Sequence, residues 1–306
     1  MVRTLHILNG ESTLNSFKQS KIDGHVFVWH EVLCEGPTRF DISSDEFWSV
    51  RSEFVTESFE TTKEEFQNKV IFPFKKLEEE ITQYTEIILW FEYDLFCQIN
   101  MIALLSWLKD LQLQGQISLI CVGETEGSDI LKGLGELPPT IYPYLLQKRV
   151  KLNTRELTHA QDAWEAYCSE YPDDLYNFVL LKMEEFQYLP AALECHLKRF
   201  PFLDSGLNEI EKKAIELYQS SRGEKTKTVG QLLKWDAHYG FGDLQYFKVL
   251  KYLEPLLILL GDDNNEILKT KVEELLDRDY ELGGATVSKW CWDSNERALI
   301  PKEPMP

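Results

Sequence analysis

Residues 86–122 read EIILWFEYDLFCQINMIALLSWLKDLQLQGQISLICV, and the topology of the first half of the chain can be argued from them. The two ends, Glu86–Phe91 and Gln116–Val122, are nearly continuous apolar runs, typical of strands that are buried on both faces. The segment between them, Leu95–Leu113, predicts a long helix because its apolar residues recur at helical spacing. Two strands joined through a helix need a crossover connection, and such connections produce parallel sheets.

The segments before this stretch continue the alternation. Thr4–Asn9 (TLHILN) predicts a first strand that ends at Gly10, and His25–Trp29 (HVFVW) predicts a second strand rich in β-branched and aromatic residues. Residues 1–150 are therefore expected to form an α/β domain with a Rossmann-like parallel sheet.

Three helices are expected between these strands. Ser12–Gln19 predicts a short helix with Ser12 as its N-cap. Residues 44–59 begin with Ser-Ser-Asp-Glu and predict a capped helix. Residues 62–84 predict a longer helical stretch that is interrupted near Pro73.

The second half of the chain carries mainly helical signals. Residues 151–204 predict a helical connector without strands. Residues 205–306 predict three short helices and a terminal hairpin, which is the outline of a small winged-helix-like α+β domain. The helices are expected at 207–220, 228–235 and 243–256, a further helix at 267–276, and the hairpin strands at 287–292 and 298–300.

Composition narrows the class of protein. The 306 residues carry 32 basic and 51 acidic side chains, a net charge of −19, which disfavours DNA coating and binding to anionic membranes. Neither a signal peptide nor a membrane-spanning run is expected. Six cysteines without a Cys-x-x-Cys pair predict buried free thiols and a cytoplasmic location.

Polar residues follow each predicted strand, at the edge where open parallel sheets bind ligands. The candidate ligand-binding residues are Gly10, Glu11, Ser12, His30, Glu31, Gly36, Glu92, Asp94 and Gly123. Glu31, Glu92 and Asp94 are the candidate metal ligands, because carboxylates suit a divalent cation such as Mg²⁺. The alternatives are that Ser12 and Asp94 only cap helices and that the glutamates are solvated loop charges.

Basic residues elsewhere in the chain could also contact a ligand or a partner. His196, Lys198 and Arg199 share one predicted helix, and we interpret them as a solvated polar face. Residues 243–256 carry few cations for a DNA-reading helix, so contact with a protein is favoured over contact with DNA. Arg39 and Arg51 are the basic residues nearest in sequence that could reach an anionic ligand.

The chain also resembles a bacterial family of uncharacterised proteins, called domain of unknown function 1835. The segments that carry the resemblance are LHILNGES, VFVWHEVLCEGP, ILWFEYDLFCQINMIALLSWL, LPAALECHLKRFP, GLNEIEKKAIEL and YGFGDLQYFKVLKYLEPLL. The ending LGGATVSKWCWD looks like the companion C-terminal domain of that family. The resemblance implies acidic pocket residues at Glu11 and at Glu31, ahead of Gly36-Pro37, and implies no particular reaction.

Three functions are compatible with these patterns. The first is a cytoplasmic sensor or adaptor that binds a nucleotide-like small molecule and contacts a protein partner through its C-terminal domain. The second is an enzyme that acts on a nucleotide or phosphoester with a divalent cation. The third is a transcription regulator.

Overall fold

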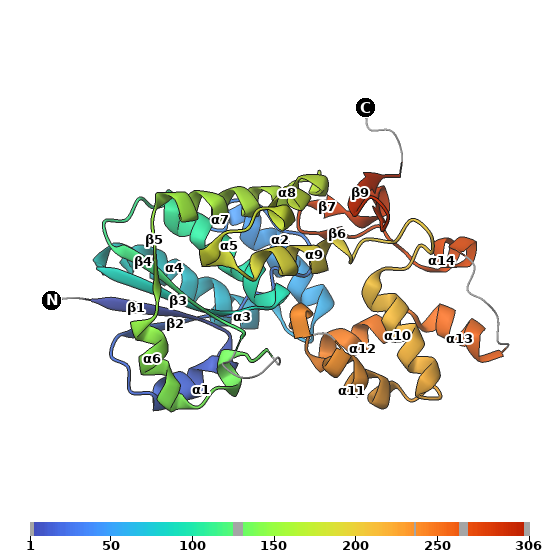
Figure 1. Cartoon of the computed structure of the whole chain (residues 1–306), viewed down its shortest axis with the longest axis horizontal. Helices are drawn as coiled ribbons and strands as arrows, with labels where there is room; N and C mark the ends of the chain where they lie inside the picture. Colours follow the sequence, from blue (N-terminus) through green and yellow to red (C-terminus); the bar gives the residue numbers. More distant parts are fainter. Residues whose placement is uncertain (1–2, 125–130, 236, 263–268, 303–306) are drawn as a thin grey trace.

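The computed structural model describes residues 3–124, 131–235, 237–262 and 269–302. It is a mixed α/β protein with a five-stranded, mostly parallel sheet (Figure 1). The strand order is β2-β1-β3-β4-β5; the first four strands are parallel and β5 runs antiparallel to β4. The strands are β1 (Thr4–Asn9), β2 (His25–Trp29), β3 (Glu86–Glu92), β4 (Gln116–Val122) and β5 (Val150–Leu152).

The four parallel strands confirm the parallel sheet predicted from residues 86–122. Asn9 of β1 lies opposite Trp29 of β2, and Glu92 of β3 lies opposite Val122 of β4. The carboxyl ends of these strands therefore meet at one edge of the sheet. The short strand β5 was not predicted.

Helices cover both faces of the sheet (Figure 1). On one face, Leu8, Ile88 and Ile120 form a small apolar cluster with Phe17 and Tyr142 from two helices. Residues of the opposite face belong to the main core. The helices of this region are α1 (Glu11–Gln19), α2 (Asp45–Ser58), α3 (Lys63–Phe66), α4 (Phe72–Glu80), α5 (Leu95–Asp110) and α6 (Tyr142–Gln147), with short 3-10 turns at Ile81–Gln83, Leu134–Glu136 and Pro139–Ile141.

The helix starts follow the predicted capping in part. Ser44 caps α2 as expected, because its side chain accepts a hydrogen bond from the Phe47 amide. The expected Ser12 cap is wrong: α1 begins at Glu11, and its N-cap is Gly10 with a φ of 81°. Glycine adopts this left-handed conformation without steric cost. The predicted interruption near Pro73 is a π-helical turn, Gln67–Ile71, which ends one residue before α4 begins.

The middle of the chain is helical, as expected from residue 154 onward. Its elements are α7 (Thr154–Tyr167), α8 (Leu175–Leu180) and α9 (Leu189–Leu197), with 3-10 turns at Pro172–Asp174 and Glu184–Phe186. Polar side chains at the end of α9 and just after it differ from the expectation. His196 and Arg199 are 0 % and 7 % exposed, so the predicted solvated face is wrong for both residues.

The last hundred residues contain helices and two short hairpins. Residues 243–256 form two helices instead of one, because Pro255 has no N–H to continue the helical hydrogen bonds. Of the helix expected at 267–276, the first two residues lie outside the described residues. The elements are α10 (Glu209–Ser220), α11 (Lys225–Trp235), α12 (Asp243–Tyr252), α13 (Glu254–Asp262), α14 (Lys269–Leu275), β6 (Glu281–Leu282), β7 (Ala285–Thr286), β8 (Trp290–Asp293) and β9 (Ala298–Pro301), with 3-10 turns at Ala237–Tyr239 and Val287–Lys289.

The terminal hairpin β8–β9 is antiparallel, as predicted. It joins the chain just after α9: the Trp292 amide donates to the Pro201 carbonyl, and the Leu203 amide donates to the Trp292 carbonyl. Trp290 and Trp292 are buried and help to fill the core.

Two expectations from composition can be compared with the structure. None of the six cysteines forms a disulfide bond, and four of them are buried, which confirms the prediction of buried thiols for those four. Within the described part of the chain, no helix is both long enough and apolar enough to cross a membrane.

Candidate functional site

A buried polar cluster lies where β3 ends and α5 begins. Ligand atoms of Glu92, Asp94 and Cys97 all lie within 4.8 Å of one another. Asp94 is the N-cap of α5, and its Oδ1 accepts a hydrogen bond from the Cys97 amide at 2.8 Å. Glu92 Oε1 accepts a hydrogen bond from the Leu134 amide at 2.7 Å. Two of the three predicted metal ligands, Glu92 and Asp94, are thus brought together, and a thiol joins them.

Both carboxyl groups of this cluster bind protons more readily than ordinary carboxyl groups. Burial raises the pKa of Glu92 to about 7, and the negative charge of Asp94 adds to the effect. Burial also raises the pKa of Asp94 to about 6. The pKa of the Cys97 thiol is raised by burial and by both carboxylates, so the thiol is protonated at neutral pH. Near pH 7 the two acids can exchange protons with a ligand or with water.

A network of amide side chains connects this cluster to the neighbouring strand ends. Asn9 donates to Cys97 Sγ at 2.9 Å, and Asn100 donates to Asn9 Oδ1 at 2.8 Å. The same Asn100 amide group donates to the Glu31 carbonyl at 2.7 Å. Asn100 is fully buried and Asn9 nearly so. These side chains fix the relative positions of the ends of β1, β2 and β3.

The C-terminal part of the chain covers Asp94. A Cβ atom built on Gly240 would lie only 2.4 Å from Asp94 Cγ, so only glycine allows this close approach. The preceding residue of the same segment, Tyr239, is fully buried. The strand-end cluster is therefore in contact with residues far along the chain.

Glu31, the third predicted metal ligand, pairs with Arg51. Both side chains are fully buried, and the shortest contact, from Arg51 Nη2 to Glu31 Oε2, is 2.7 Å. Arg51 also donates to the carbonyls of Glu35 and Pro37, which places it under the loop that follows β2. Glu31 thus anchors a loop, and its position apart from the cluster of Glu92 reflects this buried ion pair.

The remaining predicted residues make four separate contacts along the edge. His30 Nε2 lies 2.9 Å from Glu11 Oε1, which joins the ends of β2 and the start of α1. Ser12 lies on α1 beside the backbone of Gly135. Gly123 lies against Tyr188, where a Cβ atom would approach the ring to 2.7 Å. Gly10 donates its N–H to the Trp29 carbonyl at 2.9 Å.

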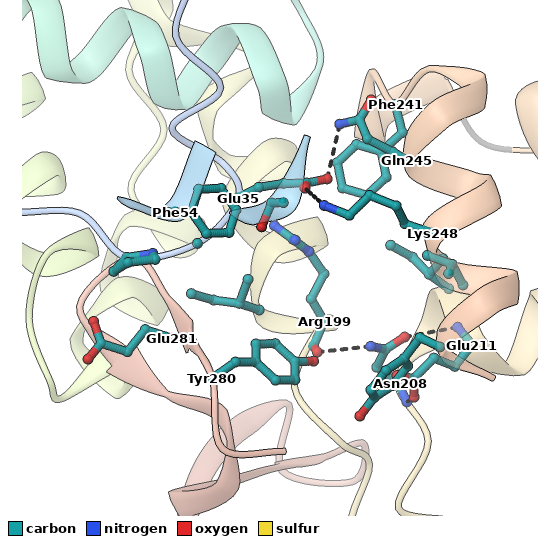
Figure 2. Close-up of a pocket in the computed structure, with 17 residues that line it drawn as sticks. Glu35, Phe54, Arg199, Asn208, Glu211, Phe241, Gln245, Lys248, Tyr280 and Glu281 are labelled. Carbon is teal, nitrogen blue, oxygen red and sulfur yellow. Dashed lines mark hydrogen bonds and ion pairs between the residues drawn. The ribbon is translucent and has the colours of Figure 1, made fainter. Parts of the chain in front are cut away.

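A cavity of about 420 Å³, here called the junction cavity, opens between the sheet region and the C-terminal helices (Figure 2). Gly36 is the one predicted site residue that lines it. The other walls come from the end of α2, Arg199 just after α9, helices α10 and α12, and the segment that leads into β6. The lining residues are Glu35, Gly36, Pro37, Phe54, Ser58, Arg199, Asn208, Ile210, Glu211, Phe241, Gln245, Lys248, Val249, Tyr252, Tyr280, Glu281 and Leu282.

A second hollow of about 390 Å³ lies beside this junction cavity. His30 and Glu31 line it together with apolar residues that include Phe59 and Phe96. Gln245 of α12 lines both spaces. The loop after β2, which contains the predicted site residues His30, Glu31 and Gly36, therefore borders both cavities.

Sequence reasoning missed two residues of this region. Cys97 is one residue of a buried helix and carries no signal beyond its position three residues after Asp94. Arg199 is separated from Gly36 by 163 positions, and the Lys198-Arg199 pair at the end of a helix resembles an ordinary surface charge. Arg39, an expected anion-binding residue, pairs with Glu46 and Glu281.

Comparisons with known proteins leave the family open. No protein-family model matches the chain, and no curated protein matches it either. The resemblance to domain of unknown function 1835 therefore stays a prediction.

Proposed function

We propose that the protein is a cytoplasmic small-ligand sensor or adaptor that binds a nucleotide-like molecule in the junction cavity. The observation that carries this proposal is the origin of the cavity walls. Residues 1–150 contribute Gly36 and Phe54, residues 151–204 contribute Arg199, and the last hundred residues contribute Tyr252 and Leu282. A ligand that contacts all three parts favours one arrangement of them over others, which is what a sensor requires.

The outer face of α12 supports the adaptor half of this proposal. Leu244 is 69 % exposed and Phe247 is 38 % exposed, and their spacing of three residues places them on one side of the helix. Exposed apolar side chains that are grouped in this way are typical of protein-contact surfaces. We assign this role to a winged-helix-like unit that follows a Rossmann-like domain.

The inner face of α12 argues against a DNA-binding regulator. Gln245 donates to Glu35 at 3.1 Å, and Lys248 lies 3.6 Å from the Glu35 carboxylate. Lys248 also sits over the Phe59 ring, 4.2 Å from its centroid. A recognition helix needs its polar and basic side chains free for base edges and phosphates, and these two are engaged within the protein.

The test of the sensor proposal is a thermal-shift screen of nucleotides and small organic acids, because a ligand that binds the folded state raises the melting temperature. The variant Ser58→Trp is designed to fill the cavity from the end of α2. Glu57→Trp adds the same bulk one residue away, on the exposed side. We expect that at least one compound raises the melting temperature of the wild type and of Glu57→Trp. The same compound should leave the melting temperature of Ser58→Trp unchanged. A screen without any such compound contradicts the proposal.

The cluster of Glu92, Asp94 and Cys97 favours a second candidate, a metal-dependent enzyme acting on a nucleotide or phosphoester. A thiol beside two carboxylates suits a borderline metal such as Zn²⁺ better than Mg²⁺, which prefers oxygen ligands only. Titration with Co²⁺ tests this: a Co²⁺–thiolate charge-transfer band should appear in the wild type and in Cys121→Ser, and should be lost in Cys97→Ser. The absence of the band from the wild type excludes metal binding through Cys97.

A further inference from the structure

We propose that the junction cavity recognises a small organic monoanion, whose acidic group binds Arg199 and whose apolar or aromatic body contacts Phe54, Phe241 and Tyr252. This inference rests on the proposed function and specifies the chemistry of its ligand. A carboxylate or a phosphodiester can supply the acidic group.

The acidic residues of the cavity are each held by a basic partner. Glu211 pairs with Arg278 through two contacts, and the longer one measures 2.8 Å. The Glu35 carboxylate accepts a hydrogen bond from Gln245 and lies 3.6 Å from Lys248 (Figure 2). The third carboxylate, Glu281, lies 3.4 Å from Arg39.

Arg199 differs from these residues because no ion pair joins it to a carboxylate in the part of the chain that the structure describes. Its side chain is 7 % exposed and enters the ring of lining residues, between Glu35 and Tyr280 in Figure 2. Among the charged side chains that line the cavity, Arg199 is therefore the one without a carboxylate partner in the described residues. An acidic group on the ligand would supply that partner.

The hydrogen bonds of Arg199 lead to the same conclusion. Its Nη1 donates to the carbonyl of Cys34, while Nε and Nη2 have no acceptor among the described residues. Because Arg199 lines the cavity, these two donors are available to an acidic group bound there. The planar fork of Nε and Nη2 matches the two oxygens of a carboxylate or a phosphodiester.

The remaining walls suit an apolar body of limited size. The Arg199 guanidinium lies over the Phe241 ring, 5.2 Å from its centroid, so an anion bound to Arg199 has an aromatic surface beside it. Phe54 and Tyr252 add two further rings, and Val249 adds an aliphatic side chain. The volume of about 420 Å³ lies within the usual range for sites of small organic ligands. A dianion is disfavoured because its second charge would lie near Glu35 or Glu211.

The test compares probes that share a body and differ in charge, using calorimetric titration of the full-length protein. Indole-3-acetate is compared with the neutral indole-3-acetamide, and 3′,5′-cyclic AMP with the neutral adenosine. We expect at least one anion to bind about tenfold or more tightly than its neutral counterpart, since hydrogen bonds to a charged group contribute about 1.5–3 kcal/mol. The two pairs distinguish a carboxylate ligand from a phosphodiester ligand.

Variants identify the residue that is responsible. Arg199→Met should abolish the preference for the anion, and Arg199→Lys should retain part of it. Lys248→Met removes the other cation that lines the cavity and should keep most of the preference. If Arg199→Met does not fold, the probe pairs on the wild type and on Ser58→Trp still decide the question.

The outcomes separate this inference from the proposed function. If neutral and anionic probes bind equally, or if the preference survives Arg199→Met, the inference is wrong. If only neutral or cationic compounds bind and Ser58→Trp abolishes their binding, the cavity function stands and the monoanion is excluded. If no compound binds in the cavity at all, both the function and the inference fail.

Discussion

Asp94 has two roles that oppose each other in charge. As the N-cap of α5 it accepts a hydrogen bond from the Cys97 amide, which favours the carboxylate form. Its burial beside Glu92 favours the protonated form, and burial is the larger effect for both residues. The two acids therefore release their protons as a coupled pair, at a pH well above that of surface carboxyl groups.

The raised pKa of Glu92 predicts that the free energy of unfolding depends on pH. The pKa of Glu92 is about 7 in the folded protein, against 4.5 for an ordinary glutamate, so between these pH values the folded state holds a proton that the unfolded state has lost. The contribution of protonated Glu92 to the free energy of unfolding is complete below pH 4.5, and it is lost as the pH rises toward and through 7. We expect Glu92→Gln, which cannot ionise, to raise the free energy of unfolding by about 1–3 kcal/mol at pH 8 relative to the wild type.

Urea denaturation between pH 5 and pH 8 measures this effect, and the difference between variant and wild type should shrink toward pH 5. Glu57→Gln is a suitable control, because this glutamate is exposed and is not among the charges that raise the pKa of Glu92. A Glu92→Gln variant whose stability follows the wild type at every pH would show that Glu92 is ionised normally in the folded protein.

Individual residues differ in how far the sequence could predict them. Glu92 and Asp94 could be found because they directly follow a strand, and parallel strands align their carboxyl ends. The buried pairing of Glu31 with Arg51 could not be found, because it depends on how α2 packs under the loop after β2. Arg199 likewise becomes a binding candidate only through contacts with residues distant in sequence.

Among the elements, strands buried on both faces were the easiest to predict. β3 and β4 are nearly continuous apolar runs of seven residues each, which is typical of strands that are buried on both faces. β5 was missed because it has three residues, two of them exposed, and thus no hydrophobic pattern. The start of α1 was misplaced because Ser12 is a good N-cap by residue type, whereas the N-cap in the structure is Gly10, two residues earlier, with a positive φ.

The N-terminus of α7 is closed by a capping box whose contribution to stability can be measured. Asn153 accepts a hydrogen bond from the Arg155 amide at 2.8 Å, and the Glu156 side chain accepts one from the Asn153 amide at 2.7 Å. We expect Asn153→Ala to lower the free energy of unfolding by about 1 kcal/mol, and Asn153→Asp to preserve it within a few tenths. Chemical denaturation measures both; equal losses in the two variants would mean that the side-chain oxygen does not cap the helix.

The whole molecule is held together by a C-terminal segment that returns to the sheet region. The Thr38 amide donates to the Gly283 carbonyl at 2.9 Å, and the Gly284 amide donates to the Tyr167 carbonyl at 3.0 Å. One apolar core runs without interruption from Leu5 in β1 to Leu299 in β9. Buried residues from both sides of the boundaries expected at residues 150 and 204 belong to this core, and the division into domains stays a prediction.

The tightest of these contacts allows the final prediction. A Cβ atom on Gly284 would lie 1.9 Å from the backbone carbonyl oxygen of Cys168, so Gly284→Ala must displace the C-terminal segment from the end of α7. We expect a loss of about 1–3 kcal/mol in the free energy of unfolding. The matched control is Gly230→Ala in α11, where a Cβ atom meets nothing within 4 Å and alanine favours the helix.

Because the core is continuous, Gly284→Ala should lower the urea midpoints of tryptophan fluorescence and far-UV circular dichroism together. Tryptophans of both halves report on this, since Trp90 lies in the sheet and Trp290 lies in the terminal hairpin. If the variant lowers only part of a biphasic transition, the C-terminal region unfolds on its own. The junction cavity would then lie between two separately stable domains, and a ligand bound there would act by fixing their orientation.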